Sequence, residues 1–345
     1  MNDDDATTTV LRINDPGEIV SGLPALFGFT PRESLVVLAL TGERGRIESG
    51  MRNDLVPAEV TSEQGEHIVR MLLRNGVSTV IVVGCSDDAA LCATNVYALC
   101  GALERAGIAL REALRCDGER WWSYSCHERC CPPAGTAYDP LASRLLAEAV
   151  VRGVAMVPDR ADLALRFAPV SGSQAVAMEA ATDQAVDGIA SQLEATMSGG
   201  GGGVSRSLVE HGATVVRQAL DRALSGVPVS NEDAAILSTW CALVPVRDLA
   251  WAQVTRANAA AHLEVWSQIA RKVVPPWEPA VLSLTGFCAW LNGDGALAWC
   301  ALDRVEQADP AYSMAELVRE TLRHGLAPDC WIPVPEHLIW DAIDG

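Results

Sequence analysis

The segment Ser34-Leu-Val-Val-Leu-Ala-Leu40 is apolar at every position after its first residue, and it decides the fold class of the first half of the chain. A strand that faces water on one side alternates apolar and polar residues, whereas a strand covered on both faces does not. The segment therefore predicts a central strand with helices on both faces of its sheet. Val77–Gly84 has the same character and predicts a second buried strand.

Further strands are predicted around these two. Residues 46–55 alternate apolar and charged side chains, which indicates a half-exposed and antiparallel neighbour. Asp117-Gly118 is a strong two-residue turn signal and predicts a hairpin of residues 108–116 and 119–125. Short strands are also predicted at 7–13 and 154–157.

Helix signals separate the strands. Asp15-Pro16-Gly17-Glu18 combines a capping carboxylate, a proline at the first helical position and an acidic first turn. Other helices are expected at 61–75, at 88–106, after Asp139-Pro140 and after Asp159. The first half therefore predicts an α/β domain, residues 1–170, with a mixed sheet of six or seven strands and helices on its faces.

The second half, residues 171–345, predicts an all-α domain, because no strand pattern follows residue 172. A glycine-rich flexible loop is expected near 198–203, and Val204-Ser205-Arg206 after it lacks the lysine of a phosphate-binding loop. The tail, residues 329–345, is expected to be extended and packed across the surface. The predicted helices are 172–197, 204–224, 231–244, 246–255, 257–273, 278–292, 295–308 and 311–325.

One stretch of this half has the residue spacing of a tetratricopeptide unit, with small residues where two helices touch and a proline after the second. The alternative is an ordinary helical hairpin within a bundle. The residues at these positions are Leu282, Gly286, Ala289, Gly293, Ala298, Leu302, Val305 and Pro310.

Composition narrows the class of protein. The chain has 345 residues, 49% apolar residues and a formal charge of −18, which fits a folded, acidic protein. A phosphate backbone repels such a surface, so nucleic acid is not an expected partner. The sequence has no apolar run of about 18 residues, so a membrane span is not expected. The acidic start Met1-Asn-Asp-Asp-Asp5 lacks the features of a secretory signal, and the eleven cysteines then suggest reduced thiols in a cytoplasm.

The common catalytic signatures are missing, and the most unusual segment is Trp121-Trp-Ser-Tyr-Ser-Cys-His-Glu-Arg-Cys-Cys-Pro-Pro133. Thiolates and imidazole are the ligands that zinc prefers, so Cys126, Cys130 and Cys131 are candidate zinc ligands. His127 or Cys116 is the candidate fourth ligand, since the predicted hairpin brings Cys116 near.

Three other interpretations of these cysteines stay open. Cys126 can form a disulfide with Cys130 or Cys131. A thiolate assisted by His127 or Arg129 can act as a nucleophile. The cysteines can also be structural, because cysteine packs as a small apolar residue.

Two loops are weaker candidates for binding a ligand. Asp87 and Asp88 follow a buried strand and can hold a magnesium ion or a polar ligand, unless Ser86 or Asp87 serves as the cap of the next helix. Arg32 and Ser34 precede the first buried strand and can bind an anion, although a plain turn explains them as well.

Several separated segments together resemble an actinobacterial family described as domain of unknown function 4192. The resemblance spans roughly residues 10–330 and implies no reaction, cofactor or partner. The resemblance also implies that the tryptophan-rich strand and its adjacent cysteines are a feature of the family. The matching segments are Asp15-Pro-Gly-Glu18, Leu23–Val37, Trp121-Trp-Ser-Tyr124, Cys130-Cys-Pro-Pro133, Ala289-Trp-Leu-Asn-Gly-Asp-Gly-Ala296 and Ala308-Asp-Pro310.

Two functional hypotheses follow. The first is a cytoplasmic interaction or regulatory protein that binds a protein partner through its helical, repeat-like half. The second is an enzyme, or a ligand or metal sensor, with a site near the segment from Cys126 to Cys131. The sequence alone does not decide whether the protein is an enzyme.

Overall fold

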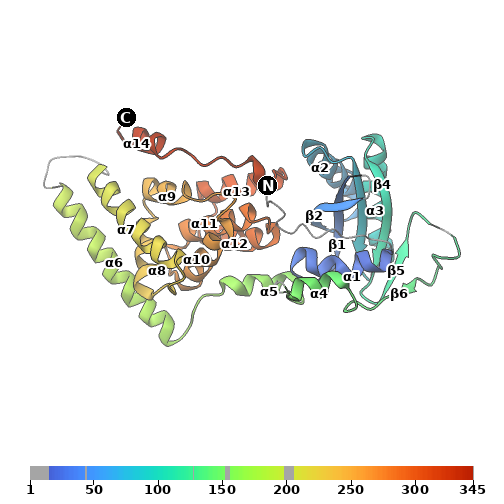
Figure 1. The fold of residues 1–345 in the computed structure, drawn as a ribbon, viewed down its shortest axis with the longest axis horizontal. Helices are drawn as coiled ribbons and strands as arrows, with labels where there is room; N and C mark the ends of the chain where they lie inside the picture. Colours follow the sequence, from blue (N-terminus) through green and yellow to red (C-terminus); the bar gives the residue numbers. More distant parts are fainter. Residues whose placement is uncertain (1–14, 43–44, 127, 152–155, 198–205, 345) are drawn as a thin grey trace, which may run out of the picture. The chain divides into compact units, whose positions relative to one another are not determined.

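The structure is a computed structural model, and it describes residues 15–42, 45–126, 128–151, 156–197 and 206–344. The chain divides into two compact units, Met1–Asp162 and Leu163–Gly345, called here the α/β unit and the helical unit. A mixed sheet with helices is followed by helices alone (Figure 1), so the predicted fold class is confirmed. None of the helices in the described ranges is long and apolar enough to cross a membrane.

Within these ranges, six strands form one sheet in the order β2-β1-β3-β4-β5-β6. β3 and β4 run parallel, and the other neighbouring strands are antiparallel. The predicted antiparallel neighbour (β2) and the hairpin at Asp117-Gly118 (β4 and β5) are confirmed. The strands are β1 Ser34–Thr41, β2 Arg46–Asp54, β3 Thr79–Cys85, β4 Ala109–Cys116, β5 Arg120–Ser123 and β6 Thr136–Ala137.

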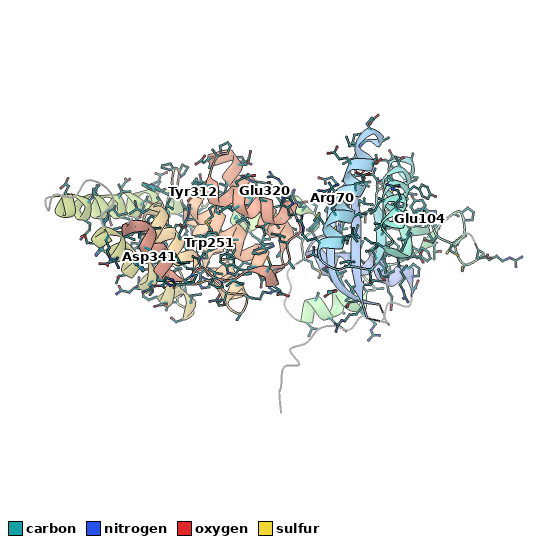
Figure 2. All side chains as sticks on the ribbon, turned by 90° about the horizontal axis from the view of Figure 1, so that it is seen from above. Arg70, Glu104, Trp251, Tyr312, Glu320 and Asp341 are labelled. Atoms are coloured by element: carbon teal, nitrogen blue, oxygen red, sulfur yellow. The ribbon has the colours of Figure 1, made fainter. Side chains whose placement is uncertain are left out.

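β1 and β3 are buried on both faces, as their apolar sequences predict. Side chains such as Leu35 and Val82 pack with α2 (Thr61–Arg74) and α3 (Ala89–Arg105), the helices that carry Arg70 and Glu104 in Figure 2. The alternate side chains, such as Val36 and Val83, pack with α1 (Pro16–Phe27) on the other face. This alternation between two apolar layers explains why the strands lack a polar face.

The close approach of α3 to β3 depends on Gly84. A Cβ atom on Gly84 would lie 2.1 Å from the Sγ atom of Cys92, which real side chains do not tolerate. α3 is also the crossover that carries the chain from β3 to its parallel neighbour β4. The glycine therefore lets the crossover helix pack directly on the strand that it follows.

Three sequence predictions for the α/β unit need correction or fall wholly or partly outside the described residues. Asp139-Pro140 does not begin a helix: Asp139 accepts a hydrogen bond from the Leu141 amide (2.9 Å) in a turn, and α4 begins later, at Arg144–Val151. The predicted strand at 7–13 lies outside the described residues. Of the predicted strand at 154–157, Val157 is described, and it forms an isolated bridge to Phe29.

The helical unit is built around α11. Every residue from Ala280 to Leu291 is buried, because α8, α10, α12 and α13 all contact this helix. The described helices are α5 Arg160–Ala164 at the unit boundary, α6 Ser173–Met197, α7 Arg206–Leu224, α8 Asn231–Trp240, α9 Val244–Trp251, α10 Ala259–Lys272, α11 Glu278–Leu291, α12 Gly295–Ala308, α13 Ser313–Arg323 and α14 Glu336–Asp344.

α11 and α12 form the helix pair whose spacing resembles a tetratricopeptide unit. A Cβ atom on Gly286 would lie 3.2 Å from the Cγ atom of Leu302 and 3.4 Å from the backbone oxygen of Ala298. The small residue therefore sits where the two helices touch. The predicted glycine-rich loop at 198–203 lies outside the described residues.

The predicted extended tail is partly wrong. Residues 331–335 have no regular structure, but the chain then forms α14. Pro335 lies directly before this helix and accepts a hydrogen bond from the Leu338 amide at 3.0 Å. A proline is favourable at a helix start, where its missing N–H has no intrahelical partner to lose.

His262 on α10 makes the stability of the helical unit pH-dependent. The residue is 1% exposed, and burial lowers the pKa of its imidazole. In the unfolded chain the pKa is about 6.5. Below that pH the unfolded state binds a proton that the folded state rejects, so the free energy of unfolding falls as pH drops from 7.5 to 5.5. The slope is at most about 1.4 kcal/mol per pH unit.

Urea unfolding at several pH values, followed by tryptophan fluorescence, measures this slope. His262→Phe should remove its share of the pH dependence. The control variant Gln268→Ala changes a residue of the same helix that does not titrate, and it should keep the slope of the unmodified chain. Equal slopes for the unmodified chain and His262→Phe would show that His262 does not carry the effect.

Candidate functional site

The candidate site in the α/β unit is the cysteine loop, residues 124–135, which joins β5 to β6. Ser123 holds its first end: the hydroxyl accepts hydrogen bonds from the amides of Ser125 (3.1 Å) and Cys126 (3.0 Å). The same hydroxyl donates to the Glu112 carboxylate on β4 (2.8 Å). The start of the loop is thereby fixed to the hairpin that precedes it.

Trp122 holds the other end of the loop. Its indole N–H donates to the Pro133 backbone oxygen at 3.1 Å. The guanidinium of Arg115, a residue of β4, lies 4.3 Å from the centre of the Trp122 ring. Gly135 has a φ of +73°, and a Cβ atom there would lie 2.5 Å from the Trp122 ring. Both the backbone conformation and the close contact therefore require glycine.

The loop brings three thiols together. The Sγ atoms of Cys126 and Cys130 are 3.6 Å apart, those of Cys130 and Cys131 are 3.9 Å apart, and all three lie within 4.8 Å of one another. Cys130 is exposed, and the other two are half-buried. An open hollow of about 200 Å³ lies beside them, lined by Trp122, Ser123, Cys126, Cys131, Pro132 and Pro133.

Cys126 and Cys131 differ in acidity. A hydrogen bond from the Glu128 backbone amide, with others from Cys131 and Cys130, lowers the pKa of the Cys126 thiol. Burial and hydrogen bonds with Cys126 and Cys130 raise the pKa of Cys131 to about 12. Of these two thiols, Cys126 therefore ionises first.

Cys116, which was predicted as a possible fourth ligand, is not part of this cluster. Cys116 at the end of β4 is buried, and its Sγ atom lies 3.5 Å from that of Cys85 on β3. The hydrogen bond from Cys116 and burial together raise the pKa of Cys85 well above its usual value. His127 lies outside the described residues. The described part of the chain therefore supplies three ligands, Cys126, Cys130 and Cys131, within 4.8 Å of one another.

Asp87 and Asp88 follow β3, as predicted. Asp88 accepts hydrogen bonds from the amides of Ala90 (2.9 Å) and Leu91 (3.0 Å), so it caps α3. The sequence argument assigned this cap to Ser86 or Asp87, and that assignment is wrong. The backbone oxygens of Ser86 and Asp87 instead accept hydrogen bonds from Arg115.

Arg32 and Ser34 lie beside this turn, at the start of β1. The Ser34 hydroxyl is buried, donates to the Arg32 backbone oxygen (2.5 Å) and accepts from Arg52 (2.7 Å). Between them, Glu33 has a φ of +43° and accepts a hydrogen bond from the Ser86 hydroxyl at 2.9 Å. These polar groups join the start of β1 to the end of β3, a role that the sequence did not indicate for Glu33 or Arg52.

A second candidate site lies in the helical unit, under the C-terminal arm, residues 326–344. The arm runs beside α9 and ends in α14 (Figure 1). Its main anchor is Trp331, which stacks on Trp251 (5.2 Å between ring centres) and meets Phe287 edge-on (4.8 Å). The Trp331 indole N–H donates to the Val254 backbone oxygen at 2.9 Å. Trp251, which lies on α9, and Asp341, which lies on α14, can both be found by their labels in Figure 2.

Trp251, Val254, Phe287 and Trp290 together form the aromatic cradle. Trp290 donates its indole N–H to the Leu326 backbone oxygen at 3.0 Å, at the start of the arm. The Trp251 indole N–H, in contrast, is buried with no hydrogen-bond acceptor among the described residues. The tail that the sequence predicts to pack across the surface, residues 329–345, contains Trp331 and Trp340. No local sequence pattern indicated the cradle.

Arginines flank the cradle and meet acidic or aromatic residues of the arm. Arg256 lies 3.6 Å from Asp329, and Arg217 lies 3.0 Å from Glu336. The Arg206 guanidinium lies 5.2 Å from the centre of the Trp340 ring. The surface under the arm therefore combines aromatic anchoring with positive charge, although the chain as a whole is acidic.

Residues 16–329 match the family described as "Domain of unknown function (DUF4192)". No curated protein and no solved structure matches the chain. The match covers most of both units and includes the cysteine loop and the aromatic cradle, but it ends at Asp329, before the anchor Trp331. It assigns no chemistry to either site.

The exposures of the thiols predict which of them react in the folded protein. Cys130 and Cys126 should be alkylated by iodoacetamide in the native state, as should exposed Cys330 in the helical unit. Buried Cys85, Cys92 and Cys116 should react at least about 100-fold more slowly, because alkylation requires the unit to open. Mass spectrometry of peptides after timed alkylation measures these rates. Comparable rates for Cys85 and Cys130 would contradict the described packing.

Proposed function

The chain belongs to the DUF4192 family, and we propose that it is an interaction module whose aromatic cradle binds a partner protein. The observation that carries the proposal is the docking of Trp331 between Trp251 and Phe287. Buried tryptophans are the side chains that contribute most often and most strongly to protein interfaces. The arm thus acts as an internal ligand and illustrates the chemistry that the cradle recognises.

The arm is a replaceable ligand. Ile332 is 80% exposed and Leu338 is 52% exposed, so the arm buries little beyond its anchor. The arm also leaves the Trp251 indole N–H without an acceptor, and an unpaired buried donor costs free energy. A partner segment that places a backbone oxygen near this N–H would therefore compete effectively with the arm.

The flanking arginines define the chemistry of the partner. Since Arg256 and Arg217 pair with carboxylates of the arm, the expected partner is an acidic, extended segment with one tryptophan. Prolines at 333 and 335 lie in the irregular stretch 331–335 that precedes α14, and a partner rich in proline would lose little conformational entropy on binding. The total charge of −18 disfavours nucleic acid as the partner.

Two further features fit this function. The tight contact of α11 and α12 at Gly286 is typical of tetratricopeptide-like pairs, which present rigid surfaces to peptides. The eleven free cysteines suit a reducing cytoplasm. We therefore propose a cytoplasmic regulatory protein with a repeat-like helical unit.

A labelled peptide of residues 326–344 tests the proposal against the full-length chain. Trp331→Ala should release the arm, so that the variant binds the peptide with a Kd of about 1–100 μM. The unmodified chain should bind at least about tenfold more weakly, because its own arm competes at a high effective concentration. Fluorescence anisotropy measures both affinities.

Controls separate release of the arm from damage to the fold. Ile332→Ala changes an exposed arm residue and should bind the peptide as weakly as the unmodified chain. A peptide in which alanine replaces the tryptophan at 331 should not bind. If the Trp331→Ala chain keeps its thermal unfolding temperature and still does not bind the unmodified peptide, the cradle is not a peptide-binding site.

A further inference from the structure

The cysteine loop has the dimensions of a zinc site. Zinc binds thiolates at about 2.3 Å in tetrahedral geometry, which places two sulfur ligands about 3.8 Å apart. The Sγ–Sγ distances of 3.6 Å and 3.9 Å in the structure match this edge, and the third distance is within 4.8 Å. We propose that Cys126, Cys130 and Cys131 bind one zinc ion as three thiolates, and the described residues supply no fourth ligand within the cluster. This inference concerns the α/β unit and is independent of the aromatic cradle.

The loop is positioned without help from the thiols. Ser123 fixes its first end and the Trp122 indole fixes Pro133 at the other, so the chain path that clusters the sulfurs exists before metal binds. A preorganised first shell reduces the entropic cost of binding. Cysteines that merely pack are usually buried, as Cys85 and Cys116 are, whereas Cys130 is exposed.

The net charge of the zinc site bears on the choice of the fourth ligand. Three thiolates and Zn²⁺ carry a net charge of −1, and a water molecule can occupy the fourth position. The hollow beside Cys126 and Cys131 has room for it. Binding converts three thiols to thiolates, and the three protons pass to the solvent. No oxidant or reductant takes part.

The experiment uses the reduced full-length chain, prepared without metal or air, with Co²⁺ as an optical probe. One Co²⁺ per chain should produce thiolate-to-cobalt charge-transfer absorption and the visible bands of a tetrahedral site. One equivalent of Zn²⁺ should displace the probe. Calorimetry in two buffers of different ionisation enthalpy should detect proton release on zinc binding that approaches three per ion at low pH.

Matched cysteine variants locate the site. Cys126→Ser, Cys130→Ser and Cys131→Ser should each weaken zinc binding by at least about 100-fold. Cys330→Ser removes an exposed cysteine of the helical unit and should leave zinc binding unchanged. The three loop variants change exposed or half-buried residues, and circular dichroism checks that each remains folded.

Three results would overturn the proposal. One is the absence of thiolate-to-cobalt charge-transfer absorption after Co²⁺ is added to the reduced chain. Another is zinc binding that is equally strong in Cys130→Ser and Cys330→Ser. The third is a chain that binds no zinc when reduced but forms a disulfide between Cys126 and Cys130 or Cys131 in air, which would make the cluster a thiol pair instead. None of these results affects peptide binding at the cradle, so the two proposals fail separately.

Discussion

The contact between β3 and α3 is the constraint on which the rest of the α/β unit depends. Gly84 lets the helix lie directly on the strand, and the helix then delivers the chain to β4, parallel to β3. Once β4 is placed, the tight turn at Asp117-Gly118 places β5 beside it. The cysteine loop leaves from β5 and is tied back to β4 through Arg115 and Glu112. The position of the thiols thus follows from a packing contact at the centre of the sheet.

The helical unit has a comparable constraint in α11. Because this helix is buried from Ala280 to Leu291, its sequence is apolar on every side and shows no stripe. Phe287 and Trp290 lie on this rigid helix, and Trp251 lies at the end of α9. The aromatic cradle is therefore part of the core that extends to the surface, and its three aromatic residues lie on helices.

Local patterns predicted most of the elements, because periodicity and capping are short-range properties. The buried strands, the hairpin and the helix that begins after Asp15 follow from such patterns, and the three clustered cysteines were named because they lie within six residues of one another. What the sequence could not supply were contacts between distant segments. Trp331 meets Val254 across 77 positions, and Cys116 pairs with Cys85 across 31. The cap of α3 was misplaced by one or two residues, since serine and aspartate are equally good caps and three stand together.

The stacking of Trp331 on Trp251 has a consequence for spectroscopy. Two indole rings at 5.2 Å and 15° are close enough for their electronic transitions to couple. Such an exciton pair gives a paired band in the circular dichroism spectrum that isolated tryptophans lack. The docked and undocked arm should therefore differ in an intrinsic optical signal, despite the eight other tryptophans of the chain. The protein carries its own reporter of whether its surface is occupied, and no added label is needed to follow it in time.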